Sequence, residues 1–187
     1  MPSSGEWLNL DLFPGVSIRE AEASDAPFIA SIYNEAIRKG GSTMDTVEKS
    51  AAEILAQMEA FNHRETILIL ERYGEVLGWG MIKAYGGDPG YRVACESSVY
   101  FRQREVRKGY GTLIKKAIIG RCKLYGYHHM VARITADNQA SIAYCERHGY
   151  ELVGRQREIG FSQGRWHDVV IMQLLLDDVG PPGPGPR

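Results

Sequence analysis

Residues 104–116, "REVRKGYGTLIKK", set two glycines within a basic cluster and lead directly into an amphipathic pattern. The segment before them, 93–101, has the alternation of a strand, and the apolar spacing after Gly109 predicts a helix over about 109–125. The first N–H groups of a helix have no partner within it, and the helix dipole adds about +0.5 of a charge at this end. Because Gly109 and Gly111 leave these groups uncovered, the stretch predicts an anion-binding turn between a strand and a helix.

The glycine spacing differs from that of the common nucleotide-binding loops. The pattern GxxxxGK[ST] is absent, and "GYG" at 109–111 lacks the third glycine and the downstream acidic residue of GxGxxG. A nucleoside triphosphate and NAD are therefore disfavoured as ligands. From these letters alone, a turn that only lets the strand and the helix pack closely remains a second interpretation.

Strand and helix patterns alternate on both sides of this turn. Predicted strands cover 16–21, 66–71, 76–85, 93–101 and 129–135, and a terminal hairpin follows over 150–161 and 166–176. Predicted helices begin at a cap formed by Ser24 or Asp25 and at Ser50, and two more cover about 109–125 and 138–148. Because right-handed crossovers join parallel neighbours, we expect strands 93–101 and 129–135 to pair in parallel within a mixed α/β fold.

Length and composition indicate one soluble domain. A chain of 187 residues buries about 70% of the surface that its unfolded form exposes. Its formal net charge of −1 disfavours a nucleic acid as partner. The start of the chain lacks the basic flank and apolar run of a signal peptide, and no later run is long enough to span a bilayer. We therefore expect a cytoplasmic protein that does not bind membranes.

The cysteines and histidines do not suggest a metal site. Three cysteines without CxxC spacing and five histidines without HExxH predict reduced thiols and no bound metal. The C-terminal letters "VGPPGPGPR" donate too few hydrogen bonds to join a sheet. We expect an N-terminal extension over 1–15, one domain over 16–176 and a disordered Pro/Gly-rich tail over 177–187.

Two motifs carry a family resemblance. The stretch "SSVYFRQREVRKGYGTLIKKAI" (97–118) resembles motif A of the GNAT acyl-CoA N-acetyltransferases, whose [QR]xxGxG or [QR]xxGxA loop holds the coenzyme A pyrophosphate. The stretch "NQASIAYCERHGY" (138–150) resembles the NxxSxxxYExxGF helix of the same family, in which the Asn bonds the pantetheine arm. The resemblance implies a mostly antiparallel central sheet with a parallel pair at the cofactor cleft, helices on both faces, and acetyl-CoA as co-substrate without a metal.

A narrower similarity extends over about 16–176. "IYNEAI" (32–37), "GYRVACESSVY" (90–100) and "GFSQGRWHDVVIMQ" (160–173) are similar to the phosphinothricin and methionine sulfone or sulfoximine acetyltransferase branch. This similarity implies a small-molecule amine as acceptor and a homodimer. The apolar terminal hairpin is compatible with such a dimer.

The resemblance also implies a set of coenzyme-binding residues. They are Val99, Tyr100, Phe101, Val106, Arg107, Lys108, Gly109, Tyr110, Gly111, Thr112, Asn138 and Ser141. The chain departs from the family at Val106, which stands at the [QR] position. Backbone N–H groups make most of the cradle, so we expect phosphate binding to persist.

Acetyl transfer from a thioester needs an uncharged amine, a stabilised oxyanion and a tolerable leaving group. In a ternary complex the amine attacks directly, so the enzyme needs no covalent nucleophile. Glu96 matches the catalytic carboxylate of the branch and is expected to accept the ammonium proton. An ordinary Glu has a pKa of about 4.3, so burial would have to raise it for effective base catalysis near neutral pH. A salt-bridged strand glutamate is the other interpretation.

The second departure is Cys145, which stands where the family usually has a Tyr and the branch often has a His. A thiolate with a pKa of about 8.5 leaves readily, so loss of this Tyr need not be fatal. Cys145 is a candidate acid, although helix cysteines are more often core residues. Tyr144 lies about 100° away around the helix and is the weaker candidate because of its facing.

Substrate selection is assigned to residues opposite the coenzyme. Arg92 matches a branch arginine suited to grip a carboxylate, sulfonyl or phosphinate group, and Tyr33 and Glu35 match the first-helix side of the pocket. Surface or packing roles remain open for all three. We expect His167 to have a structural role, His128 and His129 to be solvated or satisfied, and Lys115 and Lys116 to lie on a solvated helix face.

The sequence thus predicts transfer of an acetyl group from acetyl-CoA to the amine of a small α-amino acid or an analogue. Two alternatives stay open. The first is an enzyme whose acceptor is a peptide or protein amine, and the second is a domain that binds acyl-CoA without turnover.

Overall fold

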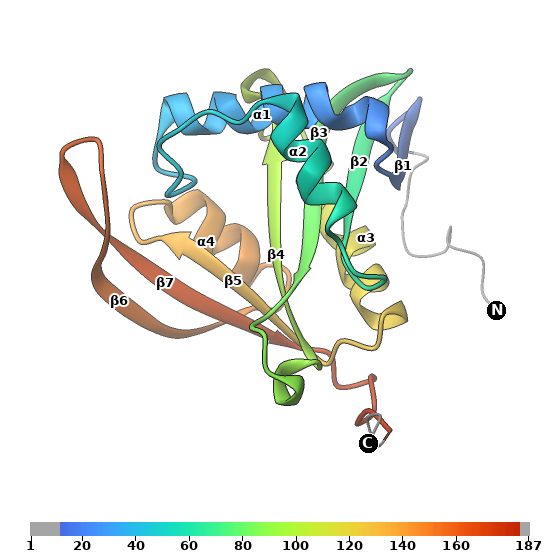
Figure 1. The fold of residues 1–187 in the computed structure, drawn as a ribbon, viewed down its shortest axis with the longest axis vertical. Coiled ribbons are helices and arrows are strands. Elements are labelled where there is room, and N and C mark those ends of the chain that lie inside the picture. The colour runs from blue at the N-terminus through green and yellow to red at the C-terminus, as the bar shows by residue number, and fades with distance from the viewer. Residues whose placement is uncertain (1–11, 184–187) are drawn as a thin grey trace.

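Seven strands form one sheet in the order β1-β2-β3-β4-β5-β7-β6 in the computed structural model, which describes residues 12–183 (Figure 1). The strands are β1 Val16–Glu20, β2 Thr66–Arg72, β3 Glu75–Ala84, β4 Ala94–Phe101, β5 His129–Thr135, β6 Glu151–Ser162 and β7 Arg165–Leu175. The pair of β4 with β5 is parallel, and the other pairs are antiparallel. This confirms the predicted mixed sheet, and the terminal hairpin closes it through β7, which pairs with β5.

Helices cover both faces of the sheet, as predicted (Figure 1). They are α1 Ala26–Lys39, α2 Ala51–Glu59, α3 Tyr110–Leu124 and α4 Gln139–Glu146, with short 3-10 turns at Ala23–Asp25, Pro89–Tyr91 and Gln103–Glu105. The helices α1 and α2 pack on one face, and α3 and α4 pack on the other.

The strand β2 shows why its sequence is apolar at every position. Ile67 and Ile69 pack in the cluster with α1 and α2, whereas Leu68 and Leu70 pack in the cluster with α3. Successive side chains of a strand point to opposite faces, so a strand covered on both sides reads as a continuous apolar run.

The predicted caps meet different outcomes at the two helices. Ser50 caps α2: its Oγ accepts from the Glu53 N–H at 3.2 Å, and the Glu53 carboxylate accepts from the Ser50 N–H at 2.8 Å. Asp25 precedes α1, but its side chain does not cap that helix. Its carboxylate accepts from the Glu22 N–H at 2.8 Å, in the capping box of the 3-10 turn, and from the Arg19 guanidinium at 2.6 and 2.9 Å.

The two parallel strands separate soon after they meet. Pairing between β4 and β5 runs only from Ala94 with His129 to Glu96 with Val131. Beyond Glu96, β4 continues alongside β3 and β5 continues alongside β7, so the two strands diverge (Figure 1). The facing edges of β4 and β5 then have no sheet partner in each other, which opens a cleft into the sheet.

The ends of the described chain contact the domain. The Phe13 ring lies 5.7 Å from the Tyr110 ring, and Asp178 pairs with Lys123 at 2.7 Å. Residues 1–11 and 184–187, on which most of the predicted extension and the end of the predicted tail fall, lie outside the described residues. Within 12–183, no helix has the length and apolarity needed to cross a bilayer. The domain boundaries stay a prediction.

Candidate active site

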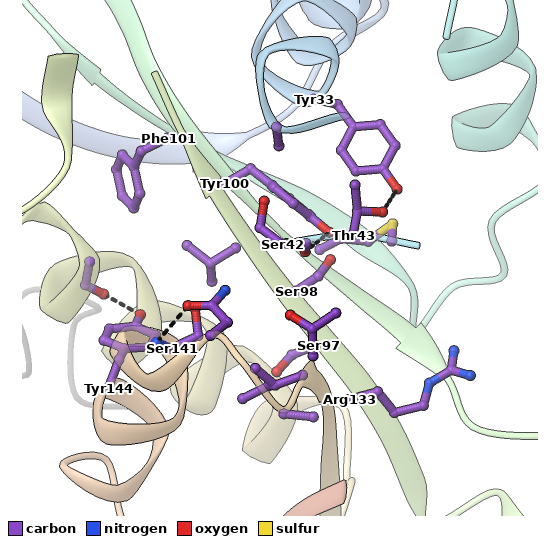
Figure 2. Close-up of a pocket in the computed structure, with 18 of the residues that line it drawn as sticks. Tyr33, Ser42, Thr43, Ser97, Ser98, Tyr100, Phe101, Arg133, Ser141 and Tyr144 are labelled. Carbon is purple, nitrogen blue, oxygen red and sulfur yellow. Dashed lines mark hydrogen bonds between the residues drawn. The ribbon is translucent and has the colours of Figure 1, made fainter. Parts of the chain in front are cut away.

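The cleft between β4 and β5 is about 1610 Å³ in volume and is lined from both faces of the sheet. A typical pocket for a drug-sized ligand measures roughly 300–1,000 Å³, so this space suits a long ligand together with a second molecule. In Figure 2, Tyr33, Ser42, Thr43 and Tyr100 lie along one side of β4, and Ser141 and Tyr144 lie on α4 across the cleft.

The glycine turn stands at one end of this cleft. Gly109 is the N-cap of α3 with φ +90°, a conformation that strains any residue with a side chain. The first turn of α3 carries no acidic residue, and no side chain caps its N–H groups. The helix therefore presents bare amides and the positive end of its dipole to the cleft.

Two of the three basic residues that precede Gly109 in 104–116 are already paired with carboxylates. Lys108 pairs with Glu105 at 3.0 Å, and Arg104 pairs with Glu75 and Glu105. Arg107 is exposed and, within the described part of the chain, pairs with no carboxylate. Of the three basic residues before Gly109, Arg107 is thus the one left to meet an incoming anion.

Gly111 fixes the distance between the two cleft helices. A Cβ at Gly111 would come within 3.1 Å of the Tyr144 ring, and the Tyr144 hydroxyl donates to the Gly111 carbonyl at 2.7 Å. Burial raises the pKa of Tyr144, and its proton is already engaged. Tyr144 therefore holds α4 against the start of α3, a contact that sequence reasoning missed.

Asn138 and Ser141 line the same wall. The Asn138 Oδ1 accepts from the Ser141 N–H at 3.1 Å and so caps α4. The amide NH₂ of Asn138 has no hydrogen-bond partner within residues 12–183. It is free to donate to a ligand in the cleft.

The geometry fits the coenzyme that the resemblance implies. Bare amides at Gly109 suit a diphosphate, and the unpaired edge of β4 beyond Glu96 suits an amide-containing arm. Predicted coenzyme residues Val99, Tyr100, Phe101, Val106 and Thr112 line the cleft as well. Tyr110 is buried and packs with the core instead.

Glu96 stands at the apex, where β4 and β5 part. Its carboxylate accepts from the Arg133 Nε at 2.9 Å, and its side chain is 29% exposed. This bond raises the pKa of Arg133. The structure therefore lacks the deep burial of Glu96 that the sequence argument required, and it adds an arginine partner.

Sequence reasoning missed Arg133 because only the strand register reveals it. Val131 is the partner of Glu96, and Arg133 lies two residues further along β5, on the same face.

Cys145 lies in the cleft wall but is almost completely buried. Burial raises the pKa of its thiol, which keeps the thiol protonated. It is thus a poor candidate for a nucleophile.

Lys115 corrects one prediction. Lys116 is exposed as expected, but Lys115 is 2% exposed and lines the cleft. The reason is that Lys115 lies one turn after Gly111, on the helix face that meets α4 and β4. Burial lowers the pKa of Lys115. Nothing in the local sequence signals this placement, because a lysine is rarely buried.

The three predicted substrate residues are not brought together. The Tyr33 hydroxyl bonds Thr43 and Asp45, each at 2.8 Å, and its ring lies 4.9 Å from that of Tyr100 in the cleft. Glu35 accepts from the Gln103 N–H at 2.9 Å and lies outside the cleft lining. It therefore anchors the loop that follows β4.

Arg92 also lies outside the cleft lining. It precedes β4, and its guanidinium donates to the Pro89 carbonyl at 3.2 Å. Arg92 is the C-cap of the 3-10 turn Pro89–Tyr91 and has a helical backbone, so it belongs to this turn and not to the strand that carries Glu96.

The histidines occupy structural positions. The His167 Nε2 bonds the Ser162 Oγ at 3.0 Å and so holds the β6–β7 turn, which confirms the structural role. The His128 Nδ1 bonds the Val179 carbonyl at 3.0 Å. Within residues 12–183, no three His, Cys, Asp or Glu side chains gather as metal ligands.

The fold and the cleft agree with comparisons to known proteins. The family described as "Acetyltransferase (GNAT) domain" matches residues 18–171. The chain therefore belongs to the GNAT acetyltransferase family, and it is an acetyl-CoA-dependent N-acetyltransferase.

Particular relatives are similar over most of their length. An L-methionine sulfoximine/L-methionine sulfone acetyltransferase of Pseudomonas aeruginosa is 34% identical over 166 residues, which cover 86% of this chain and 95% of that protein. An acetyltransferase of Salmonella typhimurium, solved with its cofactor acetyl-CoA, has a TM-score of 0.85 at 29% identity and covers 90% of this chain and 98% of its own. A phosphinothricin acetyltransferase of Sinorhizobium meliloti in complex with acetyl-CoA has a TM-score of 0.82 at 29% identity, with 87% and 89% covered.

Proposed function

We propose that the enzyme acetylates the amine of a small α-amino acid or an analogue such as methionine sulfone, methionine sulfoximine or phosphinothricin. The observation that carries the proposal is the separation of β4 and β5, which lets the bare start of α3 and the Glu96 carboxylate face one cleft. The names of the P. aeruginosa and S. meliloti relatives support these acceptors.

Glu96 is the proton acceptor of the proposed reaction. Its exposed fraction gives the acceptor's ammonium group access, and Arg133 orients the carboxylate. Positioned acid–base groups typically contribute about 10²–10⁴-fold to rate. The protonated state of Cys145 favours direct attack by the amine over a covalent enzyme intermediate.

The coenzyme roles follow the cleft wall. The amides around Gly109 and Gly111 hold the diphosphate with Arg107, and Asn138 donates to the pantetheine arm. The β4 edge from Ser97 to Phe101 supplies further amides to the same arm.

The acceptor lies on the opposite wall, against Tyr33, Tyr100 and the 40–45 loop. Arg133 takes the role that the sequence assigned to Arg92, because its guanidinium is 60% exposed and stands beside Glu96. It is placed to bind the acceptor's carboxylate while Glu96 takes the ammonium proton.

Thiol release from acetyl-CoA, measured with a panel of amines, tests the proposal. We expect turnover with methionine sulfone, methionine sulfoximine or phosphinothricin, and little turnover with peptides that carry a free N-terminal amine. Arg133→Ala should raise the acceptor KM about tenfold or more, while Arg92→Ala leaves it unchanged. Turnover only with peptides, or coenzyme binding without thiol release for any amine, would overturn the proposal.

We also propose a cytoplasmic homodimer. The support for a dimer is the β6–β7 hairpin, whose exposed large apolar side chains are Leu152, Val153, Ile159, Phe161, Trp166 and Leu175. Light scattering on the purified protein tests this assignment, and a monomer at micromolar concentration would contradict it.

A further inference from the structure

Lys115 is a charged side chain enclosed between three elements at the cleft. Its Nζ lies 3.4 Å from the Ser97 Oγ on β4, 5.5 Å from the centre of the Tyr144 ring on α4, and 4.9 Å from that of the Tyr150 ring before β6. Lys115, Ser97, Tyr144 and Cys145 all line the cleft. The amine thus borders the cleft on the side formed by α3 and α4.

The donors of this amine are mostly unused. An ammonium group has three N–H donors, and within residues 12–183 the Lys115 Nζ has one hydrogen-bond partner, the Ser97 Oγ, at a long distance. Across the same residues no carboxylate pairs with it. A buried ammonium without a counter-ion is strongly disfavoured, so the site is complementary to an incoming anion.

The other titratable groups around Lys115 bring no fixed negative charge. They are Cys95, Cys122, Tyr144, Cys145, His148 and Tyr150. Burial raises the pKa of Cys145 and Tyr150, and it lowers the pKa of His148, so these three stay neutral near neutral pH. An anionic ligand atom would therefore be the counter-charge that the amine lacks.

The two sides of the sheet present different groups to the cleft. Ser97 contacts Lys115 on the α3/α4 face, so Glu96, its neighbour in β4, points to the opposite face beside Arg133. A proton acceptor and a proton donor thus approach the cleft from opposite faces of β4. This arrangement suits a reaction in which one partner loses a proton and the other gains one.

We propose that Lys115 binds the sulfur of the coenzyme and donates a proton to it as the thioester breaks. The inference rests on the proposed function and deepens it, because it supplies the acid that Cys145 and Tyr144 are ill suited to be. The Tyr144 hydroxyl already donates its proton to the Gly111 carbonyl. Burial raises the pKa of Cys145, which makes its thiol a weaker acid.

The step balances as follows. The acceptor nitrogen, after giving one proton to Glu96, forms the C–N bond to the acetyl carbon, and the C–S bond breaks with its electron pair moving to sulfur. The Lys115 Nζ gives a proton to that sulfur and becomes neutral. The nitrogen's second proton returns through solvent to Lys115, and Glu96 releases the first. The products are the amide and the free thiol of coenzyme A.

The direction of the proton transfer agrees with the environment. A thiol has a pKa of about 8.5 and a free lysine about 10.4, so an unperturbed lysine would be the weaker acid of the two. Burial lowers the pKa of Lys115, which makes its ammonium group a better proton donor to the thiolate.

The thiolate absorbance of bound coenzyme A, titrated with pH, tests the inference. Lys115→Met removes the amine and keeps the side-chain length, and Lys116→Met is the matched control on the exposed side of the same helix. Spectra with desulfo-coenzyme A remove the signal of the protein's own cysteines. We expect a midpoint at least about one pH unit lower on the wild type and on Lys116→Met than on Lys115→Met.

Turnover provides a second readout. In Lys115→Met, kcat should fall about 10²-fold, the acceptor KM should stay unchanged, and the high-pH decline of kcat should disappear. Lys116→Met should match the wild type in all three.

Two results would overturn the inference. The first is an equal midpoint on the wild type and Lys115→Met. The second needs no variant: a midpoint on the wild type that equals the midpoint of free coenzyme A. If the wild type did not bind coenzyme A at all, the proposed function itself would be contradicted. Failure of the proposed function can therefore be distinguished from failure of the inference about Lys115.

Discussion

On the α1/α2 face of the sheet the buried side chains are nearly all aliphatic, whereas the α3/α4 face also buries an amine, three thiols, and the hydroxyl-bearing side chains of one serine and three tyrosines. Ile29, Ile32 and Ile69 are completely buried on the first face. Lys115 and Ser97 are buried on the second, directly behind the cleft. The aliphatic core of the first face contributes mainly to stability, whereas the second face accepts a stability penalty to place polar groups at the cleft.

Glu96→Gln should show the largest effect, because it removes the carboxylate that we propose as the proton acceptor, which reaches the cleft from the α1/α2 side. We expect kcat to fall by about 10²–10⁴-fold while the KM for acetyl-CoA changes little. Steady-state kinetics measures both. Glu59→Gln at the exposed end of α2 is the control and should behave as wild type. Undiminished turnover in Glu96→Gln would remove this residue from catalysis.

Ile69→Ala tests the structural role of the aliphatic core beneath α1 and α2, at a position outside the cleft lining. Loss of a fully buried aliphatic group should lower the free energy of unfolding by about 2–5 kcal/mol, as large-to-small core changes do. Urea unfolding measures this change. Turnover per folded molecule should stay at the wild-type value, and a loss of kcat in the fully folded variant would show that this core also sets the geometry of the site.

Lys115→Met, on the α3/α4 face, should increase the free energy of unfolding, whereas Ile69→Ala decreases it. Removing a buried charge should raise the free energy of unfolding at neutral pH by about 1–4 kcal/mol. The lysine pKa is lowered in the folded state from about 10.4 when unfolded. Between the folded and the unfolded pKa of this lysine, only the unfolded chain binds the proton, so the wild type gains stability as pH rises. The stability difference between Lys115→Met and the wild type therefore narrows.

Urea unfolding of both proteins from neutral pH toward pH 10 measures this difference. A Lys115→Met protein less stable than the wild type would indicate that the amine stabilises the fold through Ser97 and the two tyrosines.

Gly109→Ala should have the smallest effect on stability. The added Cβ would stand at φ +90°, about 1–2 kcal/mol unfavourable, and would approach the Phe13 ring at 3.0 Å. Calorimetry should show weaker acetyl-CoA binding, since the amide cradle must shift. Gly120→Ala in the same helix meets nothing within 4 Å and should instead add about 0.5–1 kcal/mol of stability without changing binding. Equal affinity in both variants would argue against a diphosphate at this turn.

Much of the fold was predictable because its signals are local. Strand β5 occupies the predicted residues 129–135, Ser50 caps its helix, and Gly109 starts α3. Each depends on periodicity or on a cap a few residues away, so no distant contact was needed.

The candidate site was predictable only where a motif specified it. Glu96, Gly109 and Asn138 stand at the cleft, as the resemblance implied. Arg92 does not, and Arg133 stands beside Glu96 instead. Arg133 lies beside Glu96 because of the register between β4 and β5, which pairs residues about 35 positions apart. The sequence of either strand alone does not reveal this register.

The sequence by itself determined the order of strands and helices, the glycine turn and the family, because these depend on short-range patterns. Only the tertiary structure decided that Lys115 is buried at the cleft and that Arg133 holds Glu96. The physical reason is that burial and ion pairing depend on which distant surfaces pack together, and a lysine or an arginine has the same local pattern whether it faces solvent or a cleft.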